Sequence, residues 1–421
     1  MPFNQETSMN TPDKSDRVSN GTPAELLSGV RVLDLTNVLS GPFCTYQMTL
    51  LGAEVIKIEN PKLGDLARQL GADPVANSKL MGASFQAQNA GKKSVTLNLK
   101  TEAGKGIFKK LVADADVVVE NFRPGVMKRL GLGYEVLAGI NPKLVYCAIS
   151  GFGQDGPLRD KPAYDQIVQG MSGIMSVTGD EASAPLRVGY PVCDTLGGMT
   201  AAFSIVSALY AASRTGHGRA IDVSMLDSTV VSMGWIVSNY LLAGVLPTPI
   251  GNQNMTAAPS GTFTTADSPL NIAANKQDQF ETLCRLIDRE ALIADPRFSD
   301  RESRKKNRAA LNEEINRALA ANSAHHWAEL LSAAGVPAGM VLTVPEVLDH
   351  PQLQDRRLIQ EFNSGDDANP LRVVRSGFRF SDCEPTARTP PPSLGQHTAA
   401  ILDALGIDEA EQNALRNQDV I

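Results

Sequence analysis

The sequence predicts an α/β fold in which the large domain is a doubly wound, Rossmann-like parallel sheet, accompanied by a smaller α+β domain. From about residue 30 to residue 225, short apolar runs alternate with segments of helical periodicity, as they do in open parallel sheets. A stretch rich in turn-forming residues at 247–262 interrupts this alternation. The chain beyond it has the pattern of a strand pair followed by several helices, which indicates a second, smaller unit.

The first βαβ unit gives the direction of the sheet. Apolar residues dominate 30–35, Gly41-Pro42 opens a helix, and a second apolar run covers 55–58. A strand, a helix and a strand in this order form a right-handed parallel crossover. The turn after the first strand, at 36–42, reads TNVLSGP and lacks the GxGxxG pattern that cradles a pyrophosphate. A nicotinamide-dinucleotide site is therefore disfavoured.

The chain divides into three parts by composition and pattern. Residues 1–27 are polar, carry both charge signs and lack an apolar period, which predicts a disordered tail and neither a signal nor a transit peptide. Residues 28–229 and 344–421 are expected to build the large α/β domain, and 230–343 the linkers and the small domain. The further elements that we expect are strands at 94–99, 116–120, 144–149, 261–265 and 270–274, and a helix at 102–113.

Composition and charge exclude several classes of protein. Hydrophobic residues make up 43% of the chain and charged residues 20%, and the formal net charge is -7, so neither nucleic acid nor a membrane is an expected partner. No run approaches the roughly 18 apolar residues of a membrane span. The 5 cysteines are scattered without a CxxC pair, and the adjacent His325 and His326 point in different directions on a helix. We therefore expect no disulfide framework, no metal site and a cytoplasmic protein.

The stretch after Pro191 has the pattern of a long helix that ends at 214–218 (RTGHG). Asp194 occupies the position expected of its N-cap, where free backbone N–H groups and the positive helix end stabilise an ionised carboxylate. Beside Gly197 and Gly198, which allow close approach of a ligand, such a carboxylate can act as a nucleophile. On pattern alone, a purely structural cap is the commoner role. The apolar residues of this helix define one face: Leu196, Met199, Phe203, Val206 and Tyr210.

Several fragments resemble those of the class III CoA-transferases, the CaiB/BaiF type that includes formyl-CoA transferase and carnitine CoA-transferase. The likeness runs from Gly29 to about Leu405. Each fragment is short, but their order and spacing together are specific. The fragments are GVRVLDLT at 29–36, LGAEVIKIE at 51–59, VENFRPG at 119–125, PVCD at 191–194, RTGHGR at 214–219 and LGQHT at 394–398.

The resemblance implies that Asp194 is the family's nucleophilic aspartate. In such enzymes the aspartate attacks the thioester carbonyl of an acyl-CoA, giving a mixed anhydride and free CoA thiolate. CoA then returns as an aspartyl-CoA thioester and passes from there to a carboxylic acid acceptor. The resemblance also implies an interlocked homodimer, with coenzyme A or acyl-CoA and small carboxylic acids as substrates.

The family's CoA contacts fall, residue by residue, mainly on turns that follow predicted strands and on the loop that precedes the central helix. Arg129 and Lys100 are reasonable phosphate partners, with exposed surface cations as the alternative interpretation. The implied CoA-binding residues are Leu39, Ser40, Leu97, Lys100, Asn121, Phe122, Arg123, Arg129, Lys161, Tyr164 and Asp165.

Two positions and one segment differ from the better-known relatives. Asn60 stands in place of an adenine-side arginine, and Leu39 in place of a glutamine near the reacting centre. The segment 251–256 (GNQNMT) replaces the glycine-rich substrate loop of formyl-CoA transferase. These differences put formate or oxalate specificity in doubt.

The same segment supplies the candidate substrate-binding residues Asn252, Gln253 and Asn254. Their uncharged hydrogen-bonding side chains fit the far carboxylate of a dicarboxylic acid such as succinate or glutarate. Loop polarity fits a plain turn equally well, so both interpretations stay open.

Two other functions compete with CoA transfer. An α-methylacyl-CoA racemase, from the same superfamily, uses a His-Asp pair and the central aspartate as acid and base on opposite faces of Cα. In this sequence Tyr164 occupies the position of that histidine and is followed by Asp165. A tyrosine with an unperturbed pKa of ~10 is a poor base at neutral pH. A non-catalytic acyl-CoA-binding protein is the second alternative, against which the retained Asp194 argues.

Overall fold

The computed structural model describes residues 23–363 and 370–421, and the chain divides into two compact units. Unit 1 contains the chain up to Pro162 together with Asp194–Ser224 and Leu358–Ile421, and unit 2 contains Ala163–Cys193 and Met225–Arg357. The predicted division differs, because it assigns 163–193, 225–229 and 344–357 to the large domain. Contacts between segments far apart in the sequence decide membership of a unit, and no local pattern reports them.

Most of the predicted disordered tail, 1–22, lies outside the described residues. Its last residues have a defined place in unit 1. Ala24 is buried, and its N–H donates to the Glu384 carbonyl oxygen at 2.9 Å. Residues 23–27 therefore differ from the prediction, because a backbone bond to the C-terminal part of the chain holds them.

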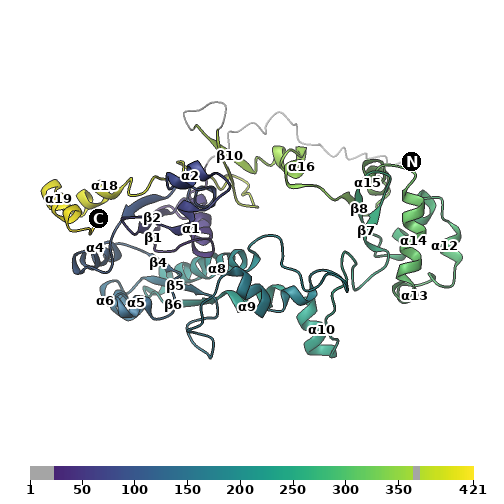
Figure 1. Cartoon of the computed structure of the whole chain (residues 1–421), viewed down its shortest axis with the longest axis horizontal. Helices are drawn as coiled ribbons and strands as arrows, with labels where there is room; N and C mark the ends of the chain where they lie inside the picture. Colours follow the sequence, from purple (N-terminus) through teal and green to yellow (C-terminus); the bar gives the residue numbers. More distant parts are fainter. Residues whose placement is uncertain (1–22, 364–369) are drawn as a thin grey trace, which may run out of the picture. The chain divides into compact units, whose positions relative to one another are not determined.

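Unit 1 is built on a six-stranded parallel sheet, which confirms the predicted doubly wound α/β fold. Its strands are β1 (Arg31–Asp34), β2 (Glu54–Glu59), β3 (Lys93–Thr96), β4 (Val117–Glu120), β5 (Val145–Ser150) and β6 (Ala220–Ser224). Their order is β3-β2-β1-β4-β5-β6, and Figure 1 labels the strands from β2 to β6 in this order. The chain adds β2 and β3 on one side of β1 and the other three strands on its opposite side. The topological switch point, where such sheets bind ligands, therefore lies between β1 and β4.

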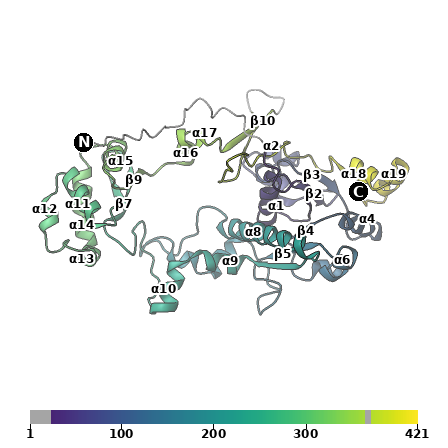
Figure 2. The same ribbon diagram turned by 180° about the vertical axis from the view of Figure 1, so that it is seen from behind.

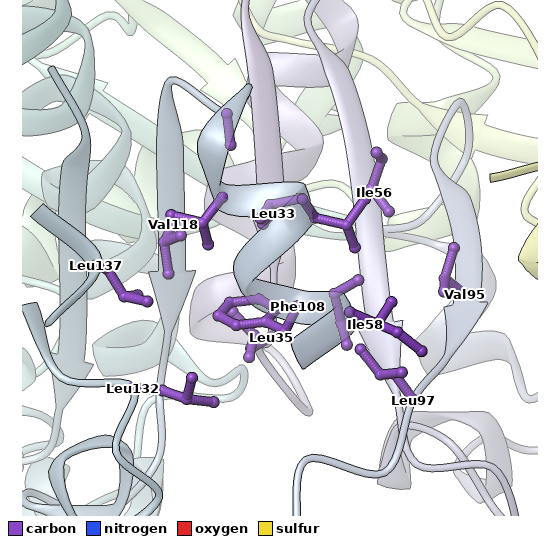
Figure 3. Packing of buried hydrophobic residues seen from close by; sticks show 14 of the residues in the cluster. Leu33, Leu35, Ile56, Ile58, Val95, Leu97, Phe108, Val118, Leu132 and Leu137 are labelled. Atoms are coloured by element: carbon purple, nitrogen blue, oxygen red, sulfur yellow. The ribbon is translucent and has the colours of Figure 1, made fainter. Parts of the chain in front are cut away.

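One face of this sheet forms the main hydrophobic core. Side chains alternate along a strand, so Leu33 and Ile58 share a face and pack with Phe108 from the helix that follows β3 (Figure 3). The opposite face carries Asp34 and Lys57, which are also fully buried. Apart from the long central helix, the α-helices of unit 1 are α1 (Ser40–Leu50), α2 (Pro74–Ser78), α3 (Ala83–Gln86), α4 (Glu102–Ala113), α5 (Val126–Arg129), α6 (Tyr134–Ile140), α18 (Thr398–Ala404) and α19 (Glu409–Asn417).

The C-terminal part of the chain completes unit 1. Helix α18 packs on β3, and Leu402 from this helix joins the core on the same face as α4. Figures 1 and 2 show α18 and α19 beside α4, although some 300 residues separate α4 from α18 in the sequence. A short antiparallel pair, β10 (Ile359–Phe362) and β11 (Leu371–Val374), precedes them.

Unit 2 combines a three-stranded antiparallel sheet with helices. Strands β7 (Ser260–Thr264) and β8 (Pro269–Ala273) agree with the predicted strand pair to within one residue, and β9 (Ala338–Met340) adds to β8. Phe263, Leu270 and Leu283 are among the residues of its apolar core. The helices of this unit are α7 (Asp165–Met171), α9 (Met225–Ser232), α10 (Trp235–Ala243), α11 (Gln277–Leu286), α12 (Ala291–Ala294), α13 (Arg301–Lys306), α14 (Arg308–Leu319), α15 (Ala324–Ala333), α16 (Val344–Leu348) and α17 (Pro351–Asp355).

The long central helix, α8 (Val192–Thr215), begins earlier than predicted. Asp194 is its third residue, so the prediction that Asp194 is the N-cap is wrong. The reason lies in α7, where Oδ1 of Asp165 accepts a hydrogen bond from the Cys193 N–H at 2.8 Å. A carboxylate from a neighbouring element thus satisfies an N–H of the first turn, and the helix extends past Asp194 towards its N-terminus.

The apolar face predicted for α8 is largely exposed in the single chain. Phe203 is 76% exposed and Tyr210 is 66% exposed, whereas the opposite side buries Ala201 and Ile205 completely. The helical periodicity groups Phe203 and Tyr210 on one face of α8, but it does not show whether the same chain buries that face. Among the described residues, α8 is also the one helix that is long and apolar enough to cross a membrane. Core helices of soluble proteins often meet the same criteria of length and composition.

Candidate active site

Two turns flank the switch point of unit 1, one after β1 and one after β4, and they carry the predicted CoA residues Leu39 and Asn121. A reciprocal pair of hydrogen bonds joins them. The Asn37 N–H donates to Oδ1 of Asn121 at 2.8 Å, and Nδ2 of Asn121 donates to the Asn37 carbonyl oxygen at 2.8 Å. The side chain of Asn121 therefore fixes the distance between the two turns.

Leu39 and Ser40 lead from the first turn into α1. Leu39 stands at the N-cap position with φ -135° and ψ -61°, and its side chain makes no capping hydrogen bond. Ser40, the first residue of the helix, is buried. An apolar N-cap leaves the first backbone N–H groups of α1 without a side-chain acceptor from this residue. Such groups, at the positive end of a helix, suit an anionic ligand.

Asp194 is half-buried in the first turn of α8. About one turn further along, Gly198 packs directly against the start of α1, because a Cβ there would lie 2.5 Å from the Ser40 carbonyl oxygen. Only glycine permits so close an approach. Within unit 1, the helix that carries Asp194 is thus in direct contact with the turn that carries Leu39.

The turn after β4 gathers positive charge. Gly125 has φ +80°, and a Cβ on it would lie 3.1 Å from Nη1 of Arg129 and 3.6 Å from Nη2 of Arg159. Within the described ranges neither guanidinium has an acidic group at ion-pair distance, and Arg123 in the same turn is exposed. The sequence reasoning did not single out Arg159. Its signal was its place in the glycine-rich loop just before the predicted Lys161.

The remaining predicted CoA residues of unit 1 have different surroundings. Lys100 and Lys161 are exposed. Leu97 is 2% exposed and belongs to the main core, so a ligand could reach only its backbone. Phe122 is half-buried and packs against the same core.

The last two predicted CoA residues lie in unit 2. Tyr164 is 69% exposed. Asp165 is buried, and its carboxylate accepts from Nε2 of Gln169 at 2.7 Å as well as from the Cys193 N–H. Arg187 lies 3.7 Å away from the same carboxylate. The carboxylate of Asp165 thus stabilises the start of α8 through the Cys193 N–H, whether or not Asp165 also contacts CoA.

The candidate substrate residues border a cavity of about 490 Å³ between their loop and strands β8 and β9. Two of the three side chains have structural partners. Oε1 of Gln253 accepts from Nδ2 of Asn312 at 3.1 Å, and Oδ1 of Asn254 accepts from the Thr256 N–H at 2.8 Å. Asn252 is exposed and is the freest of the three to meet a ligand.

Comparisons with known proteins decide the family. The sequence model described as CoA-transferase family III matches residues 27–398. The chain belongs to this family. The resemblance found in the sequence is therefore confirmed, and the protein is an enzyme, a CoA-transferase.

The relatives of this family III CoA-transferase cover nearly the whole chain. It is 42% identical to the acetyl-CoA:oxalate CoA-transferase of Acetobacter aceti, over 92% of this chain and 98% of the relative. It is 36% identical to the succinyl-CoA:glutarate CoA-transferase of Mus musculus, over 94% of this chain and 90% of the relative. The crystal structure of a CAIB/BAIF family protein from Brucella suis matches with a TM-score of 0.79 and 34% identity, over 91% of this chain and 100% of that chain.

A family III CoA-transferase uses CoA as a substrate. Near the switch point, unit 1 also buries a titratable carboxyl group. Glu120, the last residue of β4, is 5% exposed. Burial raises its pKa to about 7, although the Phe122 N–H and the Tyr146 hydroxyl donate hydrogen bonds to it. Among the described residues, no group of three or more His, Cys, Asp or Glu side chains could hold a metal ion.

Proposed function

We propose that this CoA-transferase moves CoA from an acyl-CoA donor to a dicarboxylic acid through covalent intermediates on Asp194. The observation that carries the proposal is the packing of α8 against the start of α1. Gly198 of α8 contacts Ser40, and Asp194 lies one helical turn from Gly198. The loop that joins β1 to α1 lies at the switch point of the sheet, where a nucleotide-bearing substrate is expected. The names of relatives, which include oxalate, glutarate and mesaconate as substrates, support a dicarboxylate as acceptor.

Each proposed step conserves atoms and charge. A carboxylate oxygen of Asp194 attacks the thioester carbon, the C–S bond breaks, and CoA leaves as the thiolate. The thiolate attacks the Asp194 carbonyl carbon of the anhydride and releases the donor acid as a carboxylate. The acceptor carboxylate then attacks the aspartyl-CoA thioester, and the freed thiolate takes the acyl group of the acceptor from the second anhydride. Asp194 returns as a carboxylate, so no oxidant, reductant or metal is consumed.

The ionised form that this chemistry needs suits the place of Asp194. The first turn of a helix carries partial positive charge, which favours an anion. The half-buried position also limits the water that competes for an activated acyl group.

A matrix of donors and acceptors tests the proposal. Acetyl-CoA and succinyl-CoA are each incubated with acetate, oxalate, succinate, glutarate and mesaconate, and new acyl-CoA species are identified by mass spectrometry. We expect transfer to dicarboxylates to exceed transfer to acetate. Oxalate belongs in the panel because the relative named for it is 42% identical, despite the loop at 251–256. Exchange of the Cα hydrogen of a 2-methylacyl-CoA in D₂O, without CoA transfer, would instead indicate a racemase.

We further propose that the enzyme is an interlocked homodimer. Large apolar side chains on two helices support a partner: Phe203 and Tyr210 of α8, and Leu241 and Leu242 of α10, are each more than half exposed in the single chain. Exposed apolar groups in such numbers typically mark an interface. Light scattering after size exclusion should give twice the chain mass at micromolar concentration, and Phe203→Glu should lower it. A monomer mass for the parent protein contradicts this assembly.

A further inference from the structure

Four charged side chains are buried beneath the turn that joins β1 to α1. They are Asp34, Lys57, Asp65 and Lys92, and none of the four side chains is exposed. Nζ of Lys92 lies 2.9 Å from Oδ2 of Asp34, and Nζ of Lys57 lies 3.0 Å from Oδ2 of Asp65. Nζ of Lys57 is also 4.0 Å from Oδ2 of Asp34, which joins the two pairs into one neutral network.

Asp34 and Lys57 keep their charges in the folded protein. Burial lowers the pKa of Lys92 to about 8, which leaves this side chain mostly charged at neutral pH. Burial alone would raise the pKa of Asp34, but Lys57 and Lys92 hold it well below its ordinary value. Burial would lower the pKa of Lys57, yet Asp34 and Asp65 raise it overall. An apolar set of side chains would fill this space as stably, because the desolvation of buried ions offsets much of their attraction. The network therefore calls for a reason other than stability.

Asp34, Lys57 and Asp65 each form a hydrogen bond with the backbone of the turn, whereas Lys92 donates to the Pro42 carbonyl oxygen and to the Thr45 hydroxyl in α1. Nζ of Lys57 donates to the Thr36 carbonyl oxygen at 2.7 Å, and Oδ1 of Asp34 accepts from the Thr36 N–H at 2.9 Å. Oδ1 of Asp65 accepts from the Val38 N–H at 2.9 Å. Three backbone groups within three residues are thus fixed from below by charged partners, which form stronger hydrogen bonds than neutral ones.

Val38 shows what these bonds hold in place. Its φ is +69°, a left-handed conformation that a β-branched residue rarely adopts. Such strain persists only where the surroundings over-determine it. Asp65 is itself held from behind, because its own N–H donates to Oε2 of Glu59 at 3.0 Å and Arg68 pairs with the same carboxylate.

We propose that Asp65, backed by Lys57 and Asp34, is a positioning residue for CoA transfer. By locking Val38 in the left-handed conformation it sets the direction in which Leu39 and Ser40 leave the turn. Ser40 in turn meets Gly198 on the helix that carries Asp194, so the lock fixes where the substrate-binding turn stands against that helix. The inference rests on the proposed function of the turn and of Asp194.

The test uses the full-length enzyme with three variants. Asp65→Ala removes the acceptor of the Val38 N–H, and Asp65→Asn keeps a carbonyl oxygen in its place. Glu384→Gln is the matched control: it weakens another largely buried ion pair of unit 1, with Arg375 at 2.8 Å, that does not touch the turn. Hydrogen–deuterium exchange of peptides covering 35–43 reports the lock, and kcat and KM report its effect on transfer.

We expect Asp65→Ala to speed exchange in that peptide and to lower kcat by about 10- to 100-fold, the scale expected when reacting groups are displaced by about 1 Å. Asp65→Asn should keep exchange slow and recover most of kcat, and Glu384→Gln should change neither. If exchange at 35–43 or kcat is unchanged in a folded Asp65→Ala variant, the inference is overturned. Should that variant fail to fold, a folded Asp65→Asn variant with fast exchange and a kcat as low as that predicted for alanine overturns it instead.

The exchange measurement needs no turnover, so it separates this inference from the proposed function. If the parent enzyme transfers CoA between none of the substrates in the matrix, the proposed function fails. The dependence of exchange at 35–43 on Asp65 still shows, in that case, whether the lock exists.

Discussion

The two compact units bury charge for different purposes. In unit 1, Asp34 and Lys57 bind the backbone of a turn at the switch point of the sheet. In unit 2, the guanidinium of Arg304 is 1% exposed and donates to the carbonyl oxygens of Ala258 at 2.9 Å and Phe298 at 3.0 Å. Arg304 ties two stretches of its own unit together, as a scaffold residue does. A buried charge therefore indicates function only through what it holds.

The first and largest effect follows from comparing two acids in first helical turns. Asp194 lies in the first turn of α8, and Asp278 lies in the first turn of α11 in unit 2. Asp194→Asn preserves the shape of the side chain but removes the nucleophile, so we expect kcat to fall by about 1,000-fold or more. The melting temperature should change little, because the N–H of Cys193 has its acceptor in Asp165. Steady-state transfer assays and thermal unfolding measure both quantities.

Asp278→Asn is the control for this experiment, with transfer expected at the parental rate. Hydroxylamine added with acyl-CoA should also leave a mass change on the parental peptide that contains Asp194 and none in the Asn variant. Near-parental transfer by a folded Asp194→Asn variant, or a label on Asp165, would show that another residue is the nucleophile.

Much of the fold could be predicted because its signals are local. The helix expected at 102–113 is α4 (Glu102–Ala113), and the strand expected at 116–120 is β4 (Val117–Glu120). The apolar runs at 30–35 and 55–58 predicted two strands, and these are β1 and β2, which place Leu33 and Ile58 in the main core. The opposite face of the sheet could not be predicted, because a charged residue between apolar ones, such as Lys57, has the pattern of a solvent-facing position.

The site depended more on long-range contacts. The start of α8 was misplaced because its acceptor, Asp165, stands 28 residues before Cys193. The exposure of Phe203 could not be read from the sequence either, since a periodic apolar face is the same whether it meets its own chain or a partner. The family resemblance identified Leu39 and Asn121 as CoA-binding candidates. It could not predict the hydrogen bond that the Asn37 N–H donates to the side chain of Asn121.

The second effect concerns the buried carboxyl group of unit 1, Glu120. Its pKa is raised from 4.5 to about 7, chiefly by burial, so the folded state binds more protons than the unfolded state between these values. The stability contributed by its protonation is present below pH 4.5 and is lost as the pH rises through 7. Glu120→Gln stays neutral, and its amide can still accept from the Phe122 N–H. We expect the variant to match the parent near pH 4.5 and to exceed it by about 3 kcal/mol at pH 8.

Urea unfolding of both proteins at pH 5 and pH 8, at equal concentration, measures this effect. The matched comparison is Glu346→Gln in unit 2. Glu346 is exposed, and hydrogen bonds donated by Thr343 lower the pKa of its carboxyl group. The free energy of unfolding of this variant should therefore not exceed that of the parent at pH 8. A difference between Glu120→Gln and the parent that is the same at both pH values would mean that burial does not hold the Glu120 proton.

The third and smallest effect tests whether the polar loop of unit 2 belongs to the scaffold. Oε1 of Gln253 accepts from Nδ2 of Asn312 and, at 3.4 Å, from Nη1 of Arg308, so Gln253→Ala removes a half-buried acceptor. A hydrogen bond of this kind contributes about 1 kcal/mol, which lowers the melting temperature of a unit this size by about 2–4 °C. We expect that fall with an acceptor KM within about 2-fold of the parent, because a scaffold side chain does not touch substrate. Asn252→Ala, at the exposed neighbouring position, should leave the melting temperature unchanged. If instead Gln253→Ala raises KM for dicarboxylates about 10-fold at an unchanged melting temperature, the side chain binds substrate, and the polar loop of unit 2 takes part in recognition and not only in the scaffold.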